Sequence, residues 1–120
     1  MDNKELLELA ALAAGVTGTY RALDSDFEGK FSEGISEHYG YKWWNPLEDD
    51  GDALRLAVKL RLLVECGYLT VNARYNCDEV EQWSLDDAGV TESVHGDIYA
   101  ATRRAIVRAA AEIGKSMKVN

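Results

Sequence analysis

The first clear hydrophobic pattern covers residues 3–14, where apolar side chains recur at the spacing of one helical face. These positions are Leu6, Leu9, Ala10 and Ala13. Asp2 or Asn3 can accept hydrogen bonds from the free N–H groups of a first helical turn, and Gly15 suits the left-handed position that ends many helices. The pattern predicts a short amphipathic helix that needs a surface to pack on.

Two further segments have helical patterns. Residues 50–60 carry apolar side chains over a wide arc, with one narrow polar stripe of Asp52, Arg55 and Lys59. A helix with so broad an apolar arc is expected to be mostly covered by protein. A third helix is predicted over residues 97–113, with Asp97 as its cap and Gly114 as its stop.

The segments between the helices are rich in aromatic and β-branched residues, which favour strands. Short strands are predicted within residues 16–23 and 37–44, with a polar loop over residues 24–34 that holds at most a short strand near 27–31. Residues 68–75 and 79–85 alternate in polarity, which predicts a hairpin.

Together these elements predict an α+β fold built as a helix–sheet–helix sandwich. A small, mainly antiparallel sheet of three to five strands would pack with three helices. One sheet face can be solvated, although residues 50–60 are too apolar to be expected outside. The length of 120 residues favours one domain over residues 1–120.

The net charge of the chain restricts the classes of partner that are expected. The formal net charge is −8, and residues 22–52 hold nine acidic side chains against two basic ones. Such a protein is repelled by nucleic acid unless its basic groups cluster, so nucleic acid is an unlikely partner. No signal peptide or membrane-spanning run is recognised, and Cys66 and Cys77 are the only cysteines. A cytoplasmic protein with reduced thiols is therefore expected.

Glu48, Asp49, Asp50 and Asp52 form a dense acidic cluster just after Pro46. One interpretation is a helix start, because carboxylates there accept hydrogen bonds from free N–H groups and oppose the helix dipole. The alternative is a Mg²⁺ or Ca²⁺ site, since hard cations bind clustered carboxylates. The helix start is favoured, because it explains the cluster without a ligand.

Other candidate sites are weak. Residues 24–35 resemble a calcium loop, but Ile35 stands where a bidentate acid is required. Ser93, His95 and Asp97 alternate along the chain, which does not match the linear hydrogen bonding of a catalytic triad. The cysteines and histidines lack the paired spacing of zinc sites. No catalytic residue, metal or cofactor is expected, which favours a protein that is not an enzyme.

Two groups of residues are binding candidates. One is the aromatic run of Tyr39, Tyr41, Trp43 and Trp44, which is either a core contribution or a contact patch. Homodimerisation is expected if that patch is exposed. The other is the set of arginines Arg103, Arg104 and Arg108 on the last predicted helix. They are more typical of a solvated face or of ion pairs with the acidic loop than of a DNA-binding surface.

Residues 44–60 (WNPLEDDGDALRLAVKL) and 99–115 (YAATRRAIVRAAAEIGK) resemble the two signature segments of the phage ABA sandwich family. These are small phage and prophage proteins of unknown function, and the resemblance implies a layered fold and the cytoplasm of a bacterial host. The leading functional hypothesis is a non-enzymatic phage accessory protein that binds a host or phage protein, for instance one of a host defence. The alternatives are a metal-dependent enzyme or ligand-binding protein that uses the acids of residues 48–52, and a DNA-binding protein that uses the basic last helix.

Overall fold

The computed structural model describes residues 1–22, 33–37, 42–75 and 89–118. Over these residues the chain forms three helices, α1 (Asn3–Ala14), α2 (Asp50–Lys59) and α3 (Ile98–Met117). Antiparallel strands β1 (Thr19–Ala22), β2 (Glu33–Glu37) and β3 (Lys42–Trp44) make one sheet, and β4 (Leu63–Cys66), β5 (Thr70–Arg74) and β6 (Gly89–Ser93) make another. The predicted α+β class is confirmed, with two three-stranded sheets in place of one.

The helix starts follow the predicted caps. The Asp2 carboxylate accepts a hydrogen bond from Glu5 N at 2.9 Å, and the Asp97 carboxylate accepts one from Ala100 N at 3.1 Å. Gly15 ends α1 in the left-handed region, with φ of 73°. These local signals were readable from sequence because each depends on a side chain and the backbone next to it.

Gly114 does not stop α3, and this prediction was wrong. The helix continues through Gly114 to Met117. A Cβ atom at Gly114 would lie 2.0 Å from the carbonyl oxygen of Leu9. The missing side chain therefore lets α1 and α3 approach closely, and it does not end the helix.

The strands differ from the prediction in two places. β2 falls partly in the expected polar loop, and it pairs with β1 through Tyr20–Ile35 and with β3 through Ile35–Trp44. Residues 68–75 contribute β5, which pairs with β4 and β6. The predicted partner strand at 79–85 lies outside the described residues.

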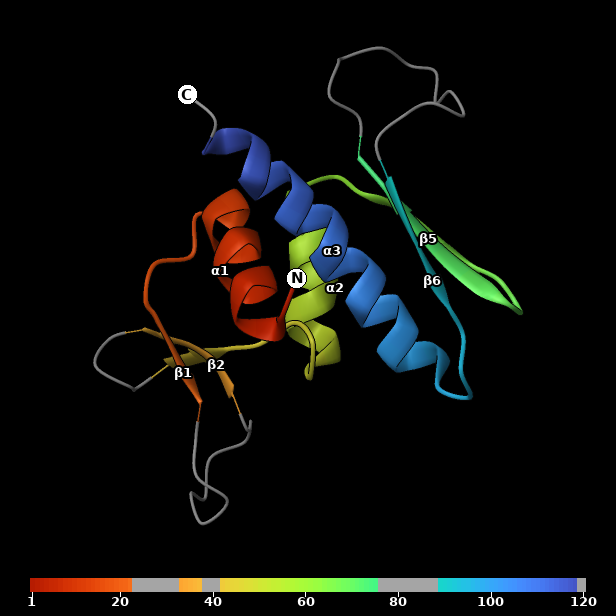
Figure 1. Cartoon of the computed structure of the whole chain (residues 1–120), viewed down its shortest axis with the longest axis horizontal. Coiled ribbons are helices and arrows are strands. Elements are labelled where there is room, and N and C mark those ends of the chain that lie inside the picture. Colours follow the sequence, from red (N-terminus) through yellow and green to blue (C-terminus); the bar gives the residue numbers. More distant parts are fainter. Residues whose placement is uncertain (23–32, 38–41, 76–88, 119–120) are drawn as a thin grey trace.

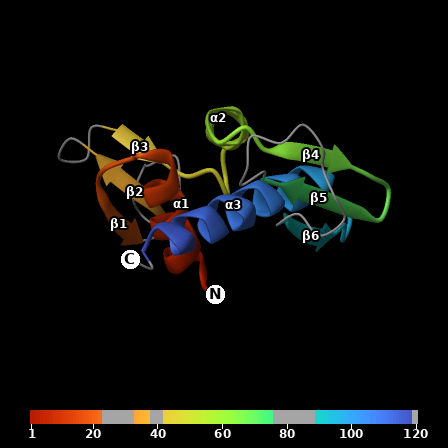
Figure 2. The same cartoon turned by 90° about the horizontal axis from the view of Figure 1, so that it is seen from above.

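Helix α3 joins the two halves of the molecule. The sheets lie on opposite sides of the helices (Figure 2), and α3 runs past α1 toward the β4–β5–β6 sheet (Figure 1). One face of α3 packs in a core with α1, α2 and Ile35, through Ile106, Val107, Ala110 and Ala111. Its other face packs Ala101, Ala105 and Ala109 against Val71 and Ala73 of β5. Small alanines on both faces let one helix approach two neighbours.

Helix α2 is covered on one side only. Ala53, Leu56 and Ala57 are buried, whereas Leu54 and Val58 are exposed. The expectation that this apolar helix would be mostly covered was therefore wrong. None of the three helices, over the described part of the chain, has the length and hydrophobicity needed to cross a membrane.

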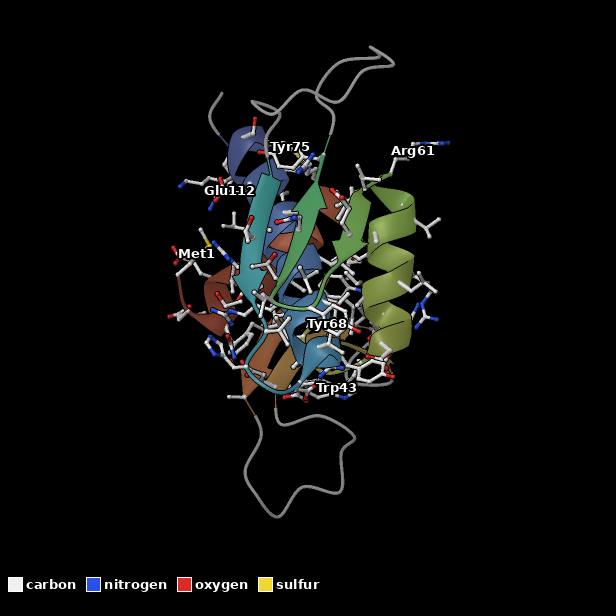
Figure 3. All side chains as sticks on the ribbon, turned by 90° about the vertical axis from the view of Figure 1, so that its right-hand side faces the viewer. Met1, Trp43, Arg61, Tyr68, Tyr75 and Glu112 are labelled. Carbon is white, nitrogen blue, oxygen red and sulfur yellow. The ribbon has the colours of Figure 1, made fainter. Side chains whose placement is uncertain are left out.

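The end of α2 carries a backbone conformation that favours glycine. Arg61 has φ of 54°, the only positive value among the described non-glycine residues, and its side chain points into solvent (Figure 3). Leu62 N donates to Ala57 O at 2.9 Å, which closes the helix end over this left-handed residue. A side chain there is strained by contact with its own carbonyl.

Replacing Arg61 with glycine is expected to stabilise the protein by about 0.5–1 kcal/mol, because glycine adopts the left-handed region without a Cβ clash. Urea unfolding of the wild type and the variant measures the difference. Lys59→Gly, inside the same helix, is the control and is expected to cost about 1 kcal/mol. Equal losses from both variants would mean that Arg61 is not left-handed in solution.

Candidate functional site

The acidic cluster serves the start of α2. Asp49 is the N-cap, and its Oδ2 accepts from Asp52 N at 2.8 Å. Asp50 pairs with Arg103 at 2.6 Å, and Asp52 pairs with Arg55 at 2.8 Å. The helix-start interpretation is confirmed, since each of these three carboxylates has a partner within the protein. Among the described residues, no group of three or more His, Cys, Asp or Glu side chains is placed to hold a metal ion.

Asn45 is the buried junction between the first sheet and α2. Its side chain amide donates to Glu33 O at 2.7 Å, and its Oδ1 accepts from Leu47 N at 2.8 Å and Glu48 N at 3.2 Å. Its backbone N–H donates to Asp52 Oδ2 at 3.0 Å. This asparagine therefore holds the turn before α2 against β2, which is a structural role.

The three candidate arginines of α3 bind groups of the same chain. Arg103 Nε donates to Leu47 O at 2.9 Å, in addition to its pair with Asp50. Arg104 and Arg108 both pair with Glu92 of β6, and Arg108 also donates to Thr91 O at 3.1 Å. These contacts tie α3 to α2 and to β6. They would have to break before the arginines could neutralise phosphates.

The aromatic run is only partly described. Tyr39 and Tyr41 lie outside the described residues. Trp44 is buried in the core, and Trp43 is half-buried. Trp43 lines a hollow of about 480 Å³ between α2, the end of α1 and β3, which also includes Lys42, Arg55 and Lys59. Trp44 thus contributes to packing between sheet and helices, whereas Trp43 lies at the wall of the hollow.

The remaining sequence candidates are not brought together. Ser93 and His95 are exposed, no hydrogen bond joins either of them to Asp97 among the described residues, and Asp97 caps α3. Cys66 is exposed, and its Sγ lies 3.7 Å from Thr102 Oγ1. Cys77 and His38 lie outside the described residues.

One tyrosine has a perturbed proton affinity. The Tyr20 hydroxyl donates to Glu33 Oε1 at 2.7 Å. This hydrogen bond, followed by burial and the nearby negative charge, raises the pKa of Tyr20 to about 12. The raised pKa keeps Tyr20 protonated, and the hydrogen bond to Glu33 links β1 to β2. Asn3 Nδ2 also donates to Glu33, at 3.1 Å, so the carboxylate ties α1 to the same sheet.

The most distinctive surface is apolar. We name it the Tyr68 face, and its exposed residues are Leu54, Cys66, Tyr68, Ile98 and Tyr99. Tyr68 is 99% exposed at the turn between β4 and β5, Leu54 is 65% exposed on α2, and Tyr99 is 69% exposed in the first turn of α3. Figure 3 shows Tyr68 beside the start of α3. Large apolar side chains gathered in this way mark interaction surfaces more often than isolated ones do.

The Tyr68 face contains two adjoining hollows. A groove of about 490 Å³ lies between α2 and α3, with Ala53, Leu54, Cys66, Ile98, Tyr99 and Ile106 among its lining residues. A second hollow of about 430 Å³ is lined by Cys66, Tyr68, Val94 and Ile98 among others. Because Cys66 and Ile98 line both, the two hollows form one continuous surface.

The sequence patterns did not predict the Tyr68 face as a binding site. Leu54 belongs to an apolar arc that was expected to be buried, and Tyr68 to a predicted strand. One available signal was Gly67–Tyr68–Leu69, which places two large apolar side chains at a turn, where polar residues are usual. Another was Ile98–Tyr99, directly after the Asp97 cap.

No family model, curated protein or solved structure matches this chain. The resemblance to the phage ABA sandwich family therefore stays a prediction, and functional inference depends on the residues themselves.

Proposed function

We propose that this protein is a non-enzymatic binding protein whose Tyr68 face contacts another protein. The observation that carries the proposal is the gathering of exposed Leu54, Tyr68, Ile98 and Tyr99 around a groove of about 490 Å³. Tyrosine is enriched in the centres of interfaces, where Lys, Asp and Glu are depleted. The groove has one charged pair, Asp50–Arg103, whose members neutralise each other.

The sequence alternatives receive less support. The acids in the described part of residues 33–52 include Glu33, Glu37, Asp49, Asp50 and Asp52, and each has a partner in the chain. That use disfavours a metal-dependent activity at residues 48–52. The pairing of Arg103, Arg104 and Arg108 likewise disfavours DNA binding. A phage accessory role against a host protein stays a prediction from the sequence resemblance.

The test is affinity capture from a bacterial lysate that also contains an untagged copy of the chain. Tagged wild type is compared with the double variant Leu54→Asp, Tyr99→Asp and with the control Met117→Asp, which changes an exposed residue at the other end of α3. We expect proteins retained by wild type and control to be lost from the double variant. Equal retention by all three, or no retained protein, would contradict binding through the Tyr68 face.

A further inference from the structure

We propose that the protein bound at the Tyr68 face is a second copy of this chain, and that Tyr68 of each copy occupies the α2–α3 groove of the other. This inference rests on the proposed function and names the partner. It follows from four properties of the face: its shape, its two-fold complementarity, its charge and its area.

The shape of the face combines a projection with a hollow. Tyr68 stands at the β4–β5 turn, and at 99% exposure no described side chain packs against it. The groove between α2 and α3 lies next to it, because Cys66 and Ile98 line both the groove and the hollow that contains Tyr68. Its volume of about 490 Å³ falls within the roughly 300–1,000 Å³ of sites that hold whole ligands. A tyrosine side chain therefore fits.

A projection and a hollow on one face satisfy the requirement of a two-fold dimer. In such a dimer one surface meets itself, so a residue that contacts a second residue is contacted in return by its copy. Rotating one copy about an axis between Tyr68 and the groove would place each tyrosine in the opposite groove. Burying a side chain of this size contributes about 1.5–3 kcal/mol of binding free energy. A two-fold dimer buries two such side chains, so the contribution is doubled.

Charge does not oppose this contact at its centre. Asp50 and Arg103 are the charged residues that line the groove, and they pair with each other at 2.6 Å.

The exposed tyrosines supply a substantial part of the area that a dimer buries. A tyrosine can bury about 150–250 Å², so Tyr68 and Tyr99 together offer roughly 250–420 Å² at their observed exposure. Stable interfaces bury about 800 Å² per partner. Leu54 and Ile98, which line the hollows of the same face, add further exposed area.

Sedimentation velocity of the full chain across a wide concentration range tests the proposal. We expect a reversible dimer in the wild type and in the control Met117→Asp. Tyr68→Ser removes the projection, and Leu54→Asp places a carboxylate in the wall of the groove. Each variant alone is expected to dimerise at least tenfold more weakly, and circular dichroism of both checks that the fold is kept.

Mixing the two variants gives the decisive result. The mixed dimer can seat the intact Tyr68 of the Leu54→Asp copy in the intact groove of the Tyr68→Ser copy, whereas neither homodimer has such a contact. We therefore expect the mixture to associate more tightly than either variant alone. A dimer that withstands both variants, or a mixture with no gain, would overturn the inference.

A monomeric wild type would also overturn the inference. If such a monomer still captured another protein in a manner lost by Leu54→Asp, Tyr99→Asp, the proposed binding function would stand without self-association. If neither dimer nor captured protein were found, both proposals would fail.

Discussion

Gly114→Ala is expected to destabilise the protein by about 2–4 kcal/mol, because overpacking of a rigid contact costs about 1–3 kcal/mol and sometimes more. The added Cβ would lie 2.0 Å from Leu9 O and 2.8 Å from Leu9 C, and both are backbone atoms of α1. These atoms cannot rotate away, so the two helices must separate. Separation would also loosen Leu7, Ala10 and Ala111, which belong to the main core.

The expected loss of stability from Gly114→Ala is opposite to the change that helix propensity alone predicts. The variant therefore tests the close contact between α1 and α3. In an exposed helix, exchanging glycine for alanine stabilises by up to about 1 kcal/mol. Gly51→Ala in α2 is the matched control, since its added Cβ would meet side-chain atoms and no backbone, namely Arg55 Nη2 at 3.1 Å and Asp49 Oδ2 at 3.2 Å. Its expected effect lies between zero and about 1 kcal/mol of stabilisation. Urea unfolding of both variants measures the contrast, and a Gly114→Ala protein as stable as wild type would refute the close crossing of α1 and α3.

Asn45→Ala is expected to cost about 2–4 kcal/mol in unfolding free energy, because it removes hydrogen bonds whose partners stay buried. Glu33 O would lose its donor at 2.7 Å, and Leu47 N would lose its acceptor at 2.8 Å. The asparagine is fully buried, so water cannot replace the amide without opening the junction. Thermal or urea unfolding gives the size of the loss.

Two further variants separate this role from a general effect of losing an asparagine. Asn72→Ala on the second sheet removes one bond, from Thr91 Oγ1 at 2.7 Å, and is expected to cost under about 1 kcal/mol. Asn45→Asp keeps the acceptor but loses the donor and adds a charge beside Asp52. Its penalty should shrink on acidification, because a protonated carboxyl can donate to Glu33 O. Similar losses of unfolding free energy from Asn45→Ala and Asn72→Ala would contradict the role of Asn45 at the junction between the first sheet and α2.

The dimer inference changes how the exposed apolar residues are interpreted. On a chain that binds no partner, Leu54, Tyr68 and Tyr99 would expose apolar surface without benefit. Within a two-fold contact the same residues are the anchors, and the Asp50–Arg103 pair lies where it adds no net charge. The same surface could serve a partner other than a second copy, and the mixing experiment distinguishes the two.

The sequence alone determined the local features. It predicted the start of α2 at residue 50, the cap at Asp97, and a cap at Asp2 or Asn3, of which Asp2 is the one used. Each of these depends on a side chain that bonds to the backbone within a few residues, so no distant contact is needed. It also determined the α+β class, because helical periodicity and β-rich segments alternate along the chain.

The roles of residues that depend on contacts between distant segments were decided only by the tertiary structure. Gly114 is of the residue type that often ends a helix. Its close contact with the backbone of Leu9 makes it a packing residue instead. Leu54 has the pattern of a core residue, yet none of the described helices and strands covers it, and it is exposed. β2 forms in a segment that is polar in sequence, because β1 and β3 pair with it on both sides. In each case the outcome depends on which surfaces meet, and periodicity along one segment does not contain that information.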